Sequence, residues 1–258
     1  MYEFRILGPL AVDVDARTVV PATPKVRQVL ALFLINLNEA MSVDTLIKEL
    51  WDTKAPRSAV GTAQTYIYQL RQMLNETSGN GTGFITTLSP GYLFRAEQDQ
   101  VDLFRFRSLV ACGQHLLGQG KQAEASETLT TALGLWHGNA LANVMVGPVL
   151  RPYLVNLEEE RLRALELRIE IDMDRGLHRK LVGELKSLTS QYPYNEWLHA
   201  RLIEALARSG RRKEALETFR SLYSLLADEL GVAPSTDVQR LQQQILVEGL
   251  PEAALSKR

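Results

Sequence analysis

The segment from Val43 to Leu74 constrains the fold of this chain more than any other. It reads VDTLIKELW, a short polar loop and then SAVGTAQTYIYQLRQML, and it is followed by FITTLSPGYLF. Two short helices, a longer third one and a hairpin with Pro90-Gly91-Tyr92 in its turn are, in this order, the parts of a winged helix-turn-helix. Such a module inserts a helix into the DNA major groove, so the sequence predicts a chain that reads DNA.

Apolar periodicity predicts three helices in this region. Hydrophobic residues recur at spacings of three and four after Pro24, after Ser42 and after Ser58, and both Pro24 and the Ser42 hydroxyl suit the start of a helix. Ahead of them, residues 4–7 and 10–14 are short β-type runs around a Gly-Pro turn, which predicts a small antiparallel sheet. The third helix is expected to bury a stripe made of Val60, Ala63, Ile67, Leu70 and Leu74.

The opposite face of the third helix carries hydrogen-bonding groups and hardly any charge. A face that is merely solvated usually draws on Glu and Lys, whereas Tyr, Gln and Thr offer donors, acceptors and methyl groups that suit base edges. We therefore favour base reading over simple solvation. The residues expected to read bases are Gly61, Thr62, Gln64, Thr65, Tyr66, Tyr68 and Gln69.

The charge balance predicts weak electrostatic attraction to DNA. The chain of 258 residues has 29 basic and 30 acidic residues and a formal net charge of −1, which excludes a generally polycationic protein. Residues 1–97 contain nine basic and nine acidic side chains. Useful affinity is therefore expected to need two protomers, or a second protein on the same promoter.

Cysteine usage and the N-terminus indicate a cytoplasmic, nucleoid-associated protein. A single cysteine, Cys112, excludes an intramolecular disulfide, and its apolar neighbours predict a buried thiol. The opening MYEFRILGPLAVDV lacks the features of a signal peptide, and no stretch reaches the ~18 apolar residues of a membrane span.

A repeat marks the second half of the chain. Gly176, Leu181, Leu185 and Leu188 recur 34 residues later, which is the tetratricopeptide period, as Gly210, Ala215, Phe219 and Leu222. The same internal spacing occurs out of phase, ahead of an insertion from Trp136 to Tyr153, at Gly120, Ala125, Leu129 and Ala132. This pattern predicts a compact helical array, whose concave surface suits protein partners and carries no chemistry.

Nothing in the sequence predicts a catalytic residue, a metal site or a cofactor. The four histidines are scattered, and no glycine-rich phosphate-binding loop is present. The charged run from Glu158 to Arg161 contains opposite charges at helical spacing and is most simply a solvated helix face, with a partner surface as the alternative.

Taken together, the motifs resemble a known family. Those of the first half look like the response-regulator type of winged helix in Streptomyces antibiotic regulatory proteins: LGPL near the start, Lys25-x-Arg27, Leu50-Trp51, Leu70-Arg71 and Pro90-Gly91-Tyr92. Those of the second half are similar to the family's bacterial transcriptional activation domain: Asp102-x-x-x-Phe106, Leu135-Trp136-x-Gly138, Leu157-Glu158-Glu159-x-Arg161, Tyr192-Pro193, Ser209-Gly210-Arg211 and Glu229-Leu230-Gly231-Val232-x-Pro234.

The resemblance implies two domains in a mainly α fold with a small β component. Residues 1–97 would form the winged-helix DNA-binding domain with its short antiparallel sheet. Residues 98–258 would form the activation domain, an all-α array of tetratricopeptide-like repeats.

The resemblance also implies contacts with the DNA backbone, from Lys25, Arg27, Trp51, Ser58, Arg71, Thr86 and Tyr92. Paired cations at 25 and 27 would position the domain without reading sequence, and ordinary solvated charges are the alternative. The Trp51 indole N–H suits a phosphate, but the ring is equally suited to packing alone. Arg71 suits an internal ion pair as well as a phosphate, and Tyr92 suits the core of the wing.

The function implied by the resemblance is that of a sequence-specific transcriptional activator of a secondary-metabolite (antibiotic) biosynthetic gene cluster. Such a protein binds direct repeats in double-stranded promoter DNA, associates with itself there, and recruits RNA polymerase through its sigma factor and other subunits. Many related winged helices carry arginines where this chain has Gly61, Gln69 and Leu88, which predicts weaker contact per monomer. The alternative is a protein-interaction scaffold whose winged domain no longer reads DNA. The sequence leaves open a small-molecule ligand in the helical array.

Overall fold

The computed structural model describes residues 2–15, 17–78 and 83–247, which fall into two compact units, Met1–Arg168 and Ile169–Arg258. The first unit opens with an antiparallel sheet of β1 (Tyr2–Arg5), β2 (Ala11–Val14) and β3 (Arg17–Val19), in the order β1-β2-β3. Alternate residues of β1 are buried, so one face of the sheet covers the core. The small sheet predicted from the β-type runs is thereby confirmed.

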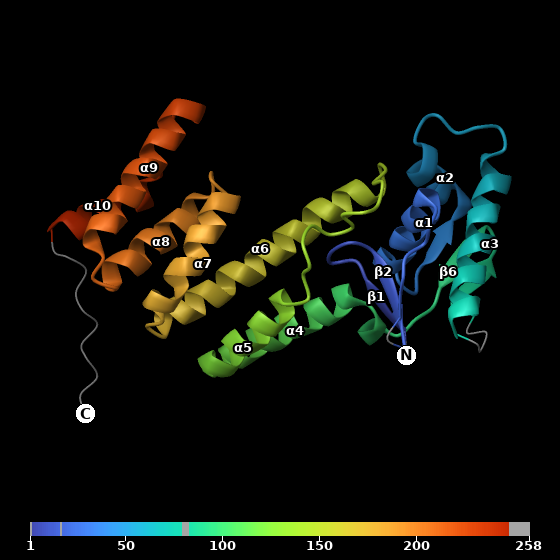
Figure 1. Cartoon of the computed structure of the whole chain (residues 1–258), viewed down its shortest axis with the longest axis horizontal. Coiled ribbons are helices and arrows are strands. Elements are labelled where there is room, and N and C mark those ends of the chain that lie inside the picture. Colours follow the sequence, from blue (N-terminus) through green and yellow to red (C-terminus); the bar gives the residue numbers. More distant parts are fainter. Residues whose placement is uncertain (1, 16, 79–82, 248–258) are drawn as a thin grey trace. The chain divides into compact units, whose positions relative to one another are not determined.

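A helix-turn-helix follows, built from α1 (Pro24–Ile35), α2 (Val43–Trp51) and α3 (Ala59–Ser78) (Figure 1). The Ser42 hydroxyl caps α2, because its oxygen accepts a hydrogen bond from the Thr45 backbone N–H at 3.0 Å. α3 buries the predicted stripe except for Val60, whose side chain is 50% exposed. Ala59 begins α3 and is itself buried, and the next residue along a helix is rotated by about 100°, which turns Val60 outward.

The wing is a three-stranded sheet of β4 (Ala40–Ser42), β5 (Ile85–Leu88) and β6 (Gly91–Phe94), in the order β4-β6-β5. Gly91 lies against β4, where a Cβ atom would approach the Met41 carbonyl oxygen to 1.9 Å. The carbonyl of Pro90 accepts a hydrogen bond from the Val43 N–H at 3.3 Å, which ties the hairpin to the start of α2. The Pro90-Gly91-Tyr92 motif is therefore required by the close approach of the wing to the helix-turn-helix.

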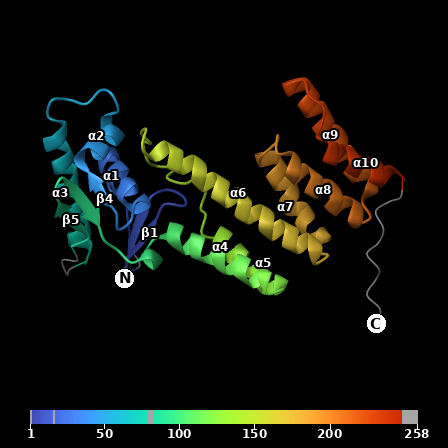
Figure 2. The same cartoon turned by 180° about the vertical axis from the view of Figure 1, so that it is seen from behind.

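The first unit continues through the 3₁₀ turn η1 (Gln98–Gln100) to the helical hairpin α4 (Asp102–Gly118) and α5 (Gln122–Leu133), which lie side by side in Figures 1 and 2. Cys112 is exposed, so the predicted buried thiol is wrong. The next residue, Gly113, takes the buried position, and a Cβ atom there would lie 2.8 Å from a carbon of Leu129 in α5. The close packing of the two helices therefore turns the neighbouring thiol outward.

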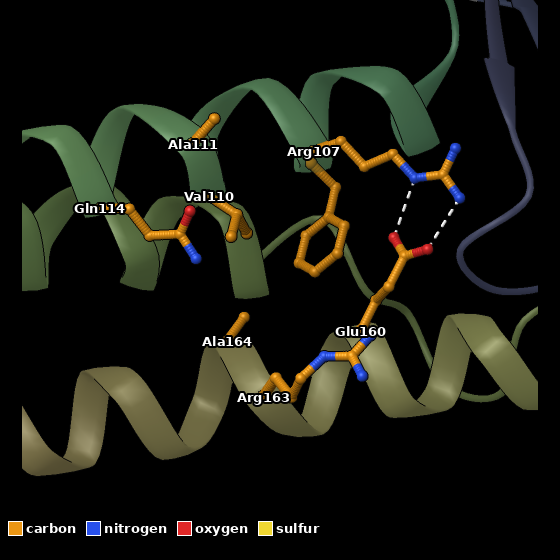
Figure 3. A pocket seen from close by; sticks show the side chains of 8 residues that line it. Arg107, Val110, Ala111, Gln114, Glu160, Arg163 and Ala164 are labelled. Atoms are coloured by element: carbon orange, nitrogen blue, oxygen red, sulfur yellow. Dashed lines mark hydrogen bonds and ion pairs between the residues drawn. The ribbon is translucent and has the colours of Figure 1, made fainter.

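Helix α6 (Leu150–Asp174) lies beside α4 around Glu160 and Ala164 (Figure 3). In Figure 3 an ion pair bridges the two helices, with the Arg107 guanidinium 2.8 Å from both oxygens of Glu160, beside a cleft of about 190 Å³. Arg161 lies 4.8 Å from the Trp136 ring centroid and also donates to the carbonyl of Gly138. The charged run is therefore only in part a solvated face, because two of its residues fasten α6 to the rest of the unit.

The second unit contains α7 (His178–Gln191), α8 (Glu196–Arg208), α9 (Arg212–Leu230) and α10 (Thr236–Val247). Consecutive helices of this unit pack on one another, as in tetratricopeptide repeats. The three glycines of the predicted repeat each take a positive φ, from 75° to 80°, at the turn before the second helix of a pair: Gly120, Gly176 and Gly210.

Within the described residues, no helix is both long and apolar enough to cross a membrane.

Candidate nucleic-acid interface

The outer face of α3 presents most of the predicted base-reading residues to solvent. The exposed members are Gly61, Gln64, Thr65, Tyr68 and Gln69, and Tyr68 is 60% exposed. The Tyr68 hydroxyl accepts a hydrogen bond from the Gln72 side chain at 2.7 Å, which orients both groups on this face. Donors and acceptors therefore lie along the helix with no described charged side chain among them.

Two predicted base readers lie off the centre of this face. Thr62 is half-buried, and its hydroxyl donates to the Ser58 carbonyl at 3.0 Å, within the first turn of α3. Tyr66 is also half-buried and stacks on Trp51 at the end of α2, with ring centroids 6.3 Å apart and planes 26° apart. This aromatic pair holds α2 against α3, so both rings have a packing role.

The predicted phosphate-binding cations of α1 are half-buried and partly engaged within the protein. The Lys25 ammonium donates to the carbonyl of Leu50, near the end of α2, and to the Gln28 side chain. The Arg27 guanidinium donates to the Pro21 carbonyl at 3.3 Å. Carbonyl acceptors neutralise no charge, so both side chains remain cations, and that of Lys25 lies beside the end of α2.

Arg71 fastens α3 to the wing. Its guanidinium donates to the carbonyl of Ile85 at 3.2 and 3.3 Å and to the Thr87 hydroxyl at 2.9 Å, and it lies 5.7 Å from the Tyr92 ring centroid. Tyr92 is only 8% exposed and belongs to the core of the wing, whereas Thr86 is exposed. From the sequence, Arg71 was considered for an internal ion pair or a phosphate contact. Within the protein it instead donates to a carbonyl and a hydroxyl of the wing.

The loop between α2 and α3 carries two cations that the sequence analysis did not single out. Lys54 and Arg57 are exposed, and in the described part of the chain neither side chain has a hydrogen bond or ion pair. They lie in the loop that leads to α3, and the backbone N–H groups at the start of a helix favour anions. Their position in the loop between two predicted helices could have identified them from the sequence.

Comparisons with known proteins agree with this geometry. The Bacterial transcriptional activator domain family matches residues 101–246, and the family described as Transcriptional regulatory protein, C terminal, matches residues 17–94. The regulatory protein DnrI of Streptomyces peucetius is 38% identical over 249 residues, which cover 95% of this chain and 92% of DnrI. The transcriptional regulator RedD of Streptomyces coelicolor is 34% identical over 248 residues, covering 95% of this chain and 71% of RedD.

A solved structure is similar over the same span. Mycobacterium tuberculosis EmbR in complex with a low affinity phosphopeptide superposes with a TM-score of 0.86 and is 32% identical, covering 95% of this chain and 65% of that one. This chain thus corresponds to about two thirds of the EmbR chain in that structure.

A winged helix-turn-helix joined to an all-α array, with these relatives, defines a DNA-binding transcriptional activator. The likeness to DnrI and RedD extends over most of each protein, so it includes both domains. The chain belongs to the Streptomyces antibiotic regulatory protein family.

Proposed function

We propose that this activator reads the promoter of a secondary-metabolite biosynthetic cluster with the outer face of α3. The observation that carries the proposal is the exposed row of uncharged hydrogen-bonding groups on α3, which in the chain follows the cations of the α2–α3 loop and precedes the wing. The relatives DnrI and RedD, which are named as regulators, support the regulatory role.

Each exposed residue of α3 has a chemical role in this proposal. The amides of Gln64 and Gln69 can pair with the N6 and N7 edge of adenine, and the Thr65 methyl group can contact a thymine methyl. Gly61 has no atom within 4 Å of the position of a Cβ, so its bare backbone lies open on the helix surface. The exposed Val60 adds a further apolar contact beside these groups.

Phosphate contacts are assigned to the cations at the two ends of the helix-turn-helix. Lys25 and Arg27 lie in the first turn of α1, and Lys54 and Arg57 lie in the loop before α3. The Ser58 hydroxyl, the exposed Thr86 of the wing and the indole of Trp51 supply neutral donors around them. These contacts set position and affinity and carry no base preference.

Several protomers are expected to act together. The winged-helix region has as many acidic as basic side chains, so one copy gains little from the DNA charge. We infer head-to-tail binding on direct repeats, followed by contact with the sigma factor and other subunits of RNA polymerase. We further infer that the protein acts by binding, without a reaction of its own, in the cytoplasm where promoter DNA lies.

The test is a comparison of sequence preference with overall affinity. Promoter fragments from operons near the gene are used in mobility-shift and randomised-site selection assays at low salt. Gln69→Ala is expected to relax preference at one or two base pairs, each worth ~1–3 kcal/mol, while the double variant Lys54→Ala/Arg57→Ala weakens all sequences alike.

The matched control is Gln244→Ala, which removes an exposed glutamine from α10, far along the chain. It is expected to leave both preference and affinity unchanged. A wild-type protein that shifts no fragment at low salt would reject DNA reading by α3. Equal effects of the glutamine and cation variants on every sequence would reject the division of roles.

A further inference from the structure

The last turn of α2 contains a buried carboxylate that is bound to the start of α6. Glu49 is 2% exposed, and its oxygens accept hydrogen bonds from the backbone N–H groups of Gly147 at 2.6 Å, Val149 at 2.8 Å and Leu150 at 3.0 Å. Gln28 of α1 donates to the same carboxylate at 2.9 Å. The N–H groups at a helix start lack partners within the helix, and a carboxylate satisfies them with favourable charge.

The approach of the two segments is too close for a side chain at position 147. A Cβ atom on Gly147 would lie 2.2 Å from the Glu49 carbonyl oxygen. The contact therefore depends on one residue from each side, a carboxylate on α2 and a glycine before α6.

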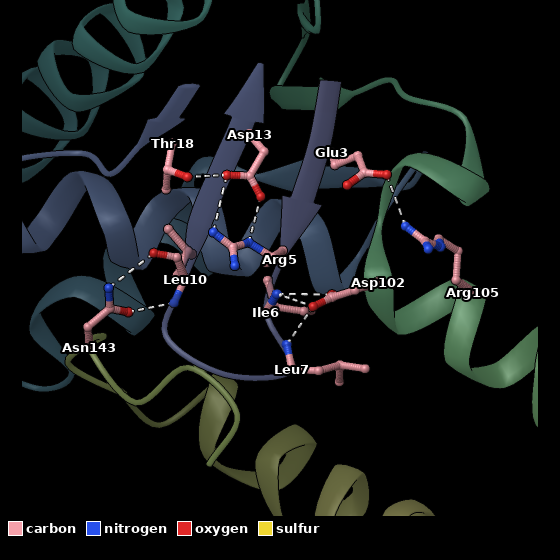
Figure 4. A network of polar contacts seen from close by, with 10 residues as sticks. All are labelled: Glu3, Arg5, Ile6, Leu7, Leu10, Asp13, Thr18, Asp102, Arg105 and Asn143. Atoms are coloured by element: carbon pink, nitrogen blue, oxygen red, sulfur yellow. Dashed lines mark hydrogen bonds and ion pairs between the residues drawn. The ribbon is translucent and has the colours of Figure 1, made fainter. Parts of the chain in front are cut away.

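Two further polar contacts tie the loop between β1 and β2 to the activation domain (Figure 4). The Asp102 carboxylate, at the start of α4, accepts hydrogen bonds from the N–H groups of Ile6 and Leu7, each at 2.9 Å. The Asn143 side chain accepts from the Leu10 N–H at 2.7 Å and donates to the Leu10 carbonyl at 3.0 Å. This loop contains the LGPL motif, so backbone groups of the motif are hydrogen-bonded to side chains of the activation domain.

The apolar core is continuous across these contacts. One buried cluster includes Phe4 and Phe33 of the winged helix, Phe106 of α4, and Leu141 and Leu150 near the start of α6. The compact unit Met1–Arg168 accordingly crosses the boundary predicted at residue 97. Directional hydrogen bonds inside such a core fix one orientation, because a shift would leave buried polar groups without partners.

We propose that Glu49, Asp102 and Asn143, here called the junction, are positioning residues that hold α4 and the start of α6 at one orientation to the reading helix. This inference rests on the proposed function. A protomer bound to one repeat then presents α4 and the start of α6 in one direction along the DNA, toward the next protomer or the polymerase. Loosening the junction disrupts cooperative binding and activation and leaves the contacts of α3 with a single repeat in place.

The experiment measures binding to one repeat separately from cooperative binding and transcription. Glu49→Gln keeps the shape but places an amide N–H₂ among backbone N–H donors, and Gly147→Ala opens the same contact from the opposite side. Asn143→Ala is a milder third variant. Each is compared with the wild type for affinity to one repeat, affinity to two tandem repeats, and promoter transcription with the RNA polymerase holoenzyme of the host. Thermal melts give the folded fraction at the assay temperature.

We expect the junction variants to change cooperativity and transcription much more than affinity for one repeat. Affinity for one repeat stays within about threefold of the wild type, while the gain from the second repeat and the transcription yield each fall about tenfold, the scale of a typical coupling between sites. The control Glu39→Gln, on an exposed glutamate of the same domain, leaves all readouts unchanged.

Two outcomes would overturn the inference. One is that all junction variants keep cooperativity and activation within twofold of the wild type. The other is that single-repeat affinity, activation and folded fraction fall in parallel, which is the result of a purely structural role. Failure of the proposed function is seen separately, in a wild-type protein that binds no repeat.

Discussion

At the scale of single residues, Asp102 shows how burial changes the chemistry of a carboxyl group. Burial raises the pKa of Asp102 from 3.8 to about 6, against the opposing effect of hydrogen bonds from Leu7 and Ile6, which favour the charged form. The folded state therefore binds this proton more tightly than the unfolded chain does. The contribution of Asp102 to stability is full below the unfolded pKa and is lost as the pH rises through the folded-state pKa of about 6.

This linkage gives a prediction for Asp102→Asn. The variant cannot titrate, so the difference in unfolding free energy between wild type and variant is expected to shrink as the pH rises from 4 through 6. It should level off about one pH unit above the folded-state pKa. Urea unfolding across pH 4 to 7.5 measures it. Near pH 7 we also expect a loss of about 1–3 kcal/mol, because the amide N–H₂ faces a backbone donor. A difference in unfolding free energy that does not change with pH would contradict the raised pKa of Asp102.

At the scale of elements, the brace between α3 and the wing is held by Arg71. Its fork reaches the Ile85 carbonyl and the Thr87 hydroxyl at once, which a lysine cannot reproduce. Both Arg71→Ala and Arg71→Lys are therefore expected to destabilise the protein by about 1–2 kcal/mol in urea unfolding. The lysine variant serves as the control for charge.

The same two variants distinguish a brace from a phosphate contact. If Arg71 acts within the protein, neither substitution changes the slope of log K against log salt. A true phosphate contact would reduce that slope by about 1 in the alanine variant and leave it unchanged in the lysine variant. A slope that falls only in the alanine variant, with the stability of both variants unaltered, would show that Arg71 binds DNA directly.

Periodicity was sufficient to predict the helices of the winged domain and the repeats, because burial on one helix face repeats at a fixed spacing. It failed where a neighbour decided the orientation, as at Val60 beside the buried Ala59 and at Cys112 beside Gly113. Glu49 gave no signal at all. Besides the Gln28 side chain, its partners are backbone N–H groups 98 to 101 residues away, and backbone groups leave no mark in the sequence.

At the scale of the whole molecule, the balance of charge and the number of cations around the helix-turn-helix set the expected behaviour on DNA. The winged-helix region has no net charge, yet Lys25, Arg27, Lys54 and Arg57 lie around the helix-turn-helix. If all four meet phosphates, one protomer on one repeat should show a slope of log K against log salt near −3.6, from about −0.9 for each phosphate. Affinity from so few contacts is modest at physiological salt.

A second repeat is therefore expected to raise affinity by about 10²-fold or more, because the neighbouring protomer binds at high effective concentration. Mobility shifts on DNA with one repeat, with two in tandem and with the second inverted measure this gain. The tandem arrangement should bind best, since identical contacts made head to tail require protomers in one direction, whereas a two-fold symmetric dimer requires inverted sites. Tighter binding to the inverted pair, or equal affinity for one repeat and two, would show that protomers do not assemble head to tail on the promoter.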